Sequence, residues 1–77
     1  MTMKVVDARN ILCPLPVIRT QDAVNTLQRG DSLRVLCTDP GATVDIPTWC
    51  RINGHRVVDT QEREGQITIT IEVGDSD

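Results

Sequence analysis

The chain has 77 residues, a formal net charge of −3, 39% hydrophobic residues and a single aromatic side chain, Trp49. This length allows one small domain with a marginal core, and the composition is typical of a folded globular chain rather than of a disordered or fibrous one. We expect no direct binding to nucleic acid, because an acidic chain without phenylalanine or tyrosine offers phosphates no basic face and bases no stacking platform.

The first half of the chain predicts a strand, a helix and a second strand. Residues 3–8 read as the first strand, and residues 14–28 as the helix, because side chains suited to the core recur there at spacings of three and four. This core stripe consists of Val17, Thr20, Ala23, Val24 and Leu27. Residues 32–38 alternate between two faces as a strand does, and Asp39-Pro40-Gly41 then predicts a turn.

The second half predicts a further helix and a closing hairpin. Asp45 is expected to cap a helix over 46–53, with Pro47 in its first turn and Gly54 as its C-terminal stop. Residues 55–61 and 66–73 form two strands around a turn at 63–65. The order strand, helix, strand, helix, strand, strand predicts an α/β (α+β) two-layer sandwich. Its two helices lie on one face of a four-stranded mixed sheet, and residues 1–77 form a single domain.

Cys13 stands at the junction between the first strand and the helix, followed by Pro14 and Pro16. Proline is tolerated in the first helical turn because the N–H it lacks would have no partner there, so we expect Pro14 as the first helical residue and Cys13 as the N-cap. The positive end of the helix dipole then lowers the thiol pKa below its free value of about 8.5. Cys13 is therefore the candidate nucleophile, and the alternative is a buried thiol that only fills space.

The other cysteines, Cys37 and Cys50, fall on inward faces and are expected to be inert core thiols. Three widely spaced cysteines without a CxxC pair indicate neither a disulfide framework nor a zinc site, so we expect reduced thiols and no metal. Cys37 could instead resolve an oxidised Cys13 as a disulfide. A catalytic pair of Cys13 with His55 is disfavoured by their distance in sequence, and Trp49 is expected in the core.

Several residues around Cys13 are candidates for positioning and docking. Leu15 and Ile18 lie off the core stripe beside Arg19, which indicates an apolar docking patch next to the thiol. Arg9 could supply positive charge to a thiolate or a partner, whereas Asp7 is expected to be a structural hydrogen-bonding group. Asp39 and Pro40 are expected to shape the nearby sheet edge, since sites gather where parallel strands end.

The N-terminal segment lacks the apolar run of a signal peptide, and no stretch of the sequence is apolar over the length of a bilayer. We therefore expect a cytoplasmic protein without membrane contact, and a monomer.

The sequence resembles the TusA (SirA-like) sulfur-carrier family over nearly its whole length. The resemblance rests on Asp7, Cys13-Pro14-Leu15-Pro16, Gly30-Asp31-Ser32-Leu33, Thr38-Asp39-Pro40, Asp45-Ile46, Trp49-Cys50 and Gly54-His55. Asn10 departs from it, because the family usually has glycine before the C-P-x-P loop. Asparagine is the residue other than glycine that best tolerates a positive φ, so the loop geometry need not change.

The resemblance implies a sulfurtransferase that carries sulfur as a persulfide on Cys13 and needs no cofactor. Its donor would be a cysteine desulfurase or a rhodanese-like protein, and its acceptor a thiol of another relay protein. The pathway stays open between tRNA thiolation, sulfur oxidation and molybdenum-cofactor synthesis. Two alternatives are a thiol redox module that uses Cys13 and Cys37, and a non-catalytic interaction or RNA-binding regulatory module, since the sandwich also resembles translation-factor domains.

Overall fold

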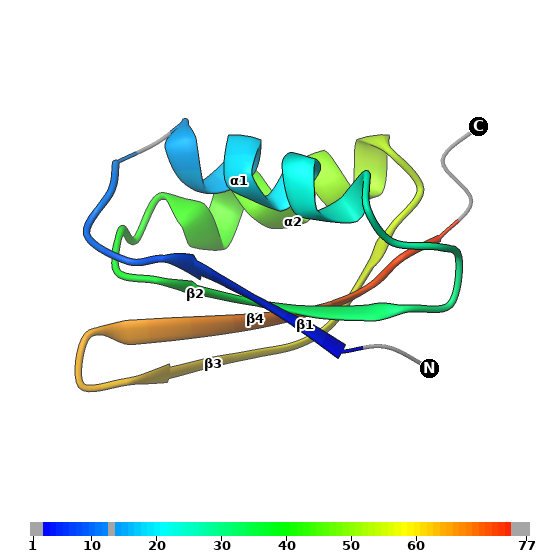
Figure 1. Cartoon of the computed structure of the whole chain (residues 1–77). Coiled ribbons are helices and arrows are strands. Elements are labelled where there is room, and N and C mark those ends of the chain that lie inside the picture. Colours follow the sequence, from blue (N-terminus) through cyan, green and yellow to red (C-terminus); the bar gives the residue numbers. More distant parts are fainter. Residues whose placement is uncertain (1–2, 13, 75–77) are drawn as a thin grey trace.

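The computed structural model describes residues 3–12 and 14–74, so Cys13 itself lies outside the described residues (Figure 1). Six elements follow one another in the chain: β1 (Met3–Ala8), α1 (Leu15–Val24), β2 (Ser32–Cys37), α2 (Ala42–Ile52), β3 (Arg56–Arg63) and β4 (Gln66–Glu72). The predicted order of strands and helices is thus confirmed.

The strands form one mixed sheet in the order β1-β2-β4-β3. β1 and β2 are parallel, with Ala8 beside Cys37, whereas β4 is antiparallel to both β2 and β3. Figure 1 shows both helices on the same face of this sheet, so the predicted two-layer sandwich is confirmed. Both helices start above the edge where β1 and β2 end.

The core lies between the sheet and the helices. The strict alternation of β2 and β4 turns every second side chain inward, as the pleat requires. The side chains with no exposed area in β2 and β4 are Leu33, Val35, Cys37, Ile69 and Ile71, and Ala8 at the end of β1 is buried to the same extent. From α1, Pro16 and Thr20 are buried against them, and the Thr20 hydroxyl donates to the Pro16 carbonyl at 2.8 Å. The buried hydroxyl of Thr20 therefore has a hydrogen-bond partner in the core.

Helix α1 is shorter than predicted at both ends. It begins at Leu15, and Pro14 is its N-cap, with φ −95° and ψ 11°. The Pro14 carbonyl already accepts the N–H of Ile18 at 3.1 Å, which is the usual situation of a capping residue. Beyond Val24 the hydrogen bonds change to the tighter i to i−3 type, so the chain up to Gln28 turns without continuing the helix.

Helix α2 is longer than predicted. It begins at Ala42 with Gly41 as N-cap, and Asp45 lies in its first turn, so the prediction that Asp45 caps a helix over 46–53 is wrong. Pro47 lies inside the helix. A proline inside a helix removes one backbone hydrogen bond and crowds the carbonyl four residues earlier, and the burial of Ala42, Ile46 and Cys50 on one face of α2 compensates for this cost.

The first turn of α2 is held by the turn that precedes it. The N–H groups of Ala42 and Thr43 donate to the carbonyls of Asp39 and Pro40 at 3.0 and 3.1 Å. These bonds satisfy donors that a helix start otherwise leaves without partners. The predicted turn at Asp39-Pro40-Gly41 is therefore also the start of the helix.

Candidate functional site

The loop between β1 and α1 carries the candidate site. In its C-terminal part the N–H of Leu15 donates to the carbonyl of Leu12 at 3.0 Å. Pro14 is exposed, whereas Pro16 is buried and fixes the first turn of α1 to the core. The prediction that Cys13 caps this helix is wrong, because Pro14 is the N-cap, and the predicted lowering of the Cys13 pKa lies outside the described residues.

Asn10 determines the path of the same loop. Its φ is 63°, in the left-handed region, which confirms that asparagine here takes a conformation suited to glycine. Its backbone N–H donates to the Thr38 hydroxyl at 2.9 Å. This bond joins the loop before α1 to the residue that follows β2. This contact of Thr38 cannot be recognised from the sequence, because its two partners are 28 positions apart.

Asp7 and Arg9 form an ion pair at the start of the loop. Arg9 donates from Nε to Oδ1 at 2.9 Å and from Nη2 to Oδ2 at 3.0 Å, and its backbone N–H donates to Oδ1 at 3.1 Å. These hydrogen bonds from Arg9 lower the pKa of the Asp7 carboxyl from 3.8 to about 2. Asp7 is thus a structural acceptor as expected. The guanidinium of Arg9 is bound to Asp7, so Arg9 is a weaker source of free positive charge than its sequence position suggests.

Asp39 and Pro40 lie in the loop after β2. The carboxylate of Asp39 accepts the N–H of Gly41 at 3.0 Å, which confirms the expected local turn. Because β1 and β2 are parallel and Ala8 pairs with Cys37, this loop and the one that contains Asn10 leave the sheet at the same edge.

Exposed apolar side chains lie close to position 13 in the sequence. The exposed fractions of Leu12, Leu15 and Ile18 are 74%, 46% and 45%. This confirms that Leu15 and Ile18 lie off the core stripe, and Arg19 beside them is exposed as well. We call Leu12, Leu15 and Ile18 the apolar rim. The sequence did not predict Leu12 as part of this rim, because it directly follows Ile11 and resembled the apolar end of the first strand.

The two other cysteines are sealed in the core. Cys37 is 0% and Cys50 1% exposed, as expected for inward positions. Burial, and to a smaller extent the charge of Asp39, raises the pKa of Cys37, whose thiol lies 3.7 Å from the Ile67 carbonyl. Burial also raises the pKa of Cys50 to about 11. Neither thiol is both accessible and ionised near neutral pH, which nucleophilic chemistry requires.

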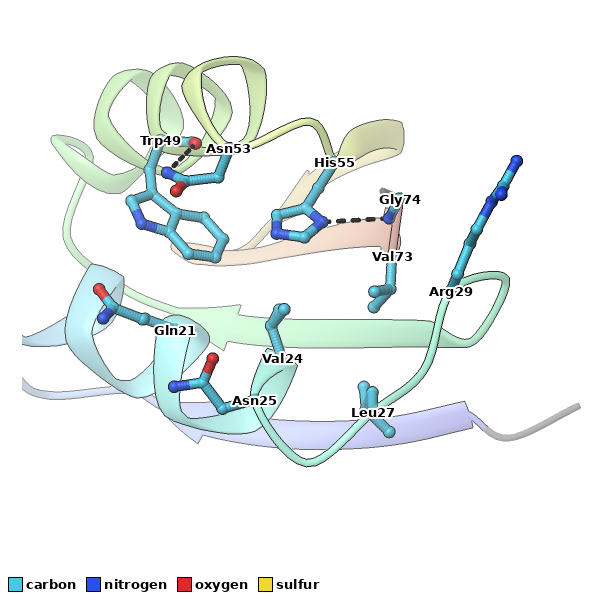
Figure 2. A pocket seen from close by; sticks show the side chains of 10 residues that line it. All are labelled: Gln21, Val24, Asn25, Leu27, Arg29, Trp49, Asn53, His55, Val73 and Gly74. Atoms are coloured by element: carbon cyan, nitrogen blue, oxygen red, sulfur yellow. Dashed lines mark hydrogen bonds between the residues drawn. The ribbon is translucent and has the colours of Figure 1, made fainter. Parts of the chain in front are cut away.

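His55 and Trp49 lie at the other end of the helix layer (Figure 2). They line a cavity of about 480 Å³ between the C-terminal ends of α1 and α2, which we call the helix-end cavity. Their ring centroids are 5.1 Å apart, and His55 Nδ1 accepts the N–H of Gly74 at 3.1 Å. Trp49 packs against the core only in part, so the expectation of a core tryptophan holds for one side of its ring.

Two further observations limit the chemistry. Within residues 3–12 and 14–74, no group of three or more His, Cys, Asp or Glu side chains is arranged to hold a metal ion. None of the helices in this part of the chain is long and apolar enough to cross a membrane.

Comparisons with known proteins place this fold and loop in one family. The family model described as sulfurtransferase TusA matches residues 4–73. The chain therefore belongs to the TusA family of sulfur carriers.

Similar proteins carry the same description. A putative sulfur carrier protein of Neisseria meningitidis is 38% identical over 72 residues, which cover 94% of this chain and 97% of that protein. The sulfur carrier protein TusA of Pseudomonas aeruginosa is 39% identical over 61 residues, or 79% of this chain and 77% of that protein. The crystal structure of a SirA-like protein from Desulfitobacterium hafniense superimposes with a TM-score of 0.82 at 26% identity, covering 96% of this chain and all of that one.

The left-handed conformation of Asn10 predicts how substitutions there behave. Asn10→Gly should leave stability within about 0.5 kcal/mol of the parent, because glycine adopts this φ freely. Asn10→Val should cost about 1–3 kcal/mol, because a β-branched side chain is strained there. Urea unfolding of both variants measures the difference. Equal stability of the glycine and valine variants would show that the loop does not hold a positive φ.

The burial of His55 predicts a pH-dependent stability. Burial lowers the pKa of folded His55, whereas an unfolded histidine titrates near pH 6.5, at about the free value. Between these two values the unfolded chain binds more protons, so stability is full above about pH 6.5 and falls as the pH drops through this window. The urea midpoint should therefore decrease on acidification from about pH 7 to about pH 5.5.

His55→Gln is the matched variant, because its amide can accept the Gly74 N–H but cannot titrate. Its urea midpoint should change less over the same interval. The carboxyl of Asp7, with a pKa of about 2, stays ionised throughout and does not interfere. If both proteins lost stability equally, the loss would not arise from His55.

Proposed function

We propose that this chain carries sulfur as a persulfide on Cys13, taking it from a donor protein and passing it to an acceptor thiol. The observation that supports this most is the contrast between the cysteines. Cys37 and Cys50 are sealed and have raised pKa values, whereas Leu12 and Pro14, which flank Cys13, are exposed. Membership of a family of sulfur carriers agrees with this assignment.

Loading would be a single exchange at sulfur. The Cys13 thiolate attacks the outer sulfur of a donor persulfide, the bond between the two donor sulfurs breaks, and the donor cysteine leaves as a thiolate. Cys13 then holds the outer sulfur with its proton, as a persulfide. Unloading repeats the exchange, with the acceptor thiolate attacking the outer sulfur and Cys13 leaving. No electrons are gained or lost overall, so the step needs no oxidant, metal or cofactor.

The local backbone favours the thiolate that this exchange needs. Position 13 precedes the N-terminus of α1, where the helix dipole favours negative charge. Pro14 and Pro16 provide no N–H, so the lowering of the Cys13 pKa should be moderate. A moderate value suits a relay, because Cys13 must act both as attacking group and as leaving group.

The apolar rim would be the docking surface for both partners. Leu12, Leu15 and Ile18 offer apolar area around the thiol, and Arg19 adds a positive charge at its border. Arg9 would contribute less, because Asp7 already binds its guanidinium. The donor would be a cysteine desulfurase or a rhodanese-like protein, and the acceptor another relay protein with a free thiol. Pro14, Pro16, Asp39 and Pro40 would shape the surface without taking part in the exchange.

The burial of Cys37 weighs against the thiol redox alternative. A disulfide between Cys13 and Cys37 would require Cys37 to leave the core, where its side chain is 0% exposed. The acidic balance of the chain, with a net charge of −3, weighs against RNA binding.

Single substitutions of the three cysteines test whether Cys13 carries the sulfur. Cys13→Ser should abolish sulfur loading and keep the fold, because serine cannot form a persulfide. Cys37→Ala and Cys50→Ala should still load and should cost about 1–2 kcal/mol as small core deletions. The mass of each protein after incubation with a persulfide donor shows the gain of one sulfur atom.

Sulfur gained by Cys13→Ser would place the carrier cysteine elsewhere. Loss of two hydrogens by the unsubstituted protein would instead indicate a disulfide and the redox alternative.

Charged substitutions on the apolar rim test the docking surface. Leu15→Asp and Ile18→Asp should change stability by no more than about 0.5 kcal/mol, because both side chains are exposed. Transfer should fall, since binding a partner would bury the new charge against an apolar contact. The rates of transfer from a cysteine desulfurase and to an acceptor thiol measure this, together with thermal unfolding.

Ile52→Asp is the matched control, because Ile52 is a 75% exposed apolar residue of α2 away from the rim. Its transfer rates should equal those of the parent. Unchanged transfer in both rim variants would show that the partners dock elsewhere, and a large loss of thermal stability would place these side chains in the core.

A further inference from the structure

The helix-end cavity is separate from the apolar rim. Gln21 and Asn25 line it from the C-terminal end of α1, and Trp49 and Asn53 from the end of α2. Pro14 and position 13 precede the opposite end of α1. The volume, about 480 Å³, falls within the range of small-molecule sites, and no role in sulfur transfer explains it.

One donor in the cavity is fixed in direction. His55 is only 7% exposed, and its Nδ1 accepts the N–H of Gly74, so the neutral ring carries its proton on Nε2. Figure 2 shows Nε2 turned towards Trp49 and Val24, on the side of the cavity. Every fully buried side-chain nitrogen or oxygen in the described part of the chain has a partner. Nε2 has no partner among residues 3–12 and 14–74 and is therefore open to the cavity.

Further polar groups of the lining have no partner within the protein. The side chains of Gln21 and Asn25 make no hydrogen bond to any described residue, whereas the amide of Asn53 already donates to the Trp49 carbonyl at 2.9 Å. Figure 2 shows Gln21 and Asn25 on the α1 side, across from Trp49 and His55. Amide donors and the His55 donor thus face the same space from two sides.

The charge of the lining has one sign. Arg29 is its cation, and no aspartate or glutamate is among the residues described there, although the whole chain has a net charge of −3. Arg29 forms no ion pair with any residue in the described ranges. Its nearest acidic neighbour in sequence, Asp31, uses its carboxylate to accept the N–H of Gln28. A guanidinium without a carboxylate partner at a cavity rim favours an anionic ligand.

Apolar side chains and one flat ring form the smaller part of the lining. Val24, Leu27 and Val73 contribute aliphatic side chains, and the Trp49 indole lies tilted by 30° to the His55 imidazole. The helix C-termini direct carbonyl oxygens to this end of the layer, which repels an anion from the helix axes. The negative group of a ligand would therefore lie away from the helix axes, beside the His55 Nε2–H, and its flat body against Trp49 (Figure 2).

We propose that the helix-end cavity binds a small organic carboxylate with a flat apolar body. The His55 Nε2–H and the amides of Gln21 and Asn25 hold the carboxylate, Arg29 attracts it from the rim of the cavity, and the indole of Trp49 covers the ring. The proposed site involves neither Cys13 nor the apolar rim, so the test of this site is independent of the test of sulfur transfer.

Benzoate tests this proposal, with benzamide as the uncharged molecule of the same shape. Titration of the full chain is followed by the fluorescence of Trp49, its single tryptophan, and by the amide resonances of residues at the cavity. We expect saturable changes at Trp49 and Gly74 with benzoate, and affinity for benzamide about tenfold weaker, the size expected for a charge-assisted hydrogen bond.

Arg29→Gln and Arg51→Gln separate the site from a general effect of charge. Both arginines are exposed and removal of either changes the net charge equally, but Arg51 does not line the cavity. Arg29→Gln should weaken benzoate about tenfold, and Arg51→Gln should leave its affinity unchanged. Equal losses in the two variants, equal affinity for benzoate and benzamide, or the absence of saturable changes would overturn the proposal.

Discussion

The parallel pairing of β1 with β2 is the constraint on which the rest of the structure depends. Ala8 lies beside Cys37, so both strands end at one edge of the sheet, and the chain must cross back over the sheet to begin each next strand. Both crossings are helices on the same face, and both begin at this edge (Figure 1). One end of the molecule therefore holds two helix N-termini and two loops, and the opposite end holds two helix C-termini.

This asymmetry separates two kinds of surface. The loops at the N-terminal end are held by backbone bonds such as that from Asn10 to Thr38, and they leave Leu12, Leu15 and Ile18 exposed around position 13. The C-terminal end encloses a cavity with amide, imidazole and guanidinium groups. The two proposals, sulfur transfer at Cys13 and a dissociable ligand in the helix-end cavity, therefore concern opposite ends of the helix layer.

The fold could be predicted because its signals are local. Alternation in residues 32–38 and 66–73, and the three-and-four spacing that begins at Val17, identify the strands and the first helix. The start of α2 could not be predicted in this way. Pro47 suggested that the first turn of the helix begins near residue 46, whereas the helix begins at the buried Ala42. The spacing of Ala42, Ile46, Trp49 and Cys50 was the signal that could have revealed it.

The exposure of Leu15 and Ile18 was predictable because it follows from their spacing along the helix, whereas the role of Cys13 stays a prediction. Contacts between distant segments could not be predicted, and they include the bond from Asn10 to Thr38 and the pairing of His55 with Trp49. Arg9 and Asp7 are close in sequence. Only the structure shows that they form an ion pair, which leaves Arg9 less available to a partner protein.

The relative reactivity of the three thiols tests most directly whether sulfur chemistry is confined to Cys13. The native protein would be treated with limiting iodoacetamide near neutral pH, digested, and mapped by mass spectrometry, with a sample labelled in denaturant as reference. Cys13 should be labelled first, and Cys37 and Cys50 only after unfolding, because their thiols are sealed and their pKa values raised. Equal labelling of all three cysteines in the folded protein would contradict the assignment of Cys13 as the sulfur carrier.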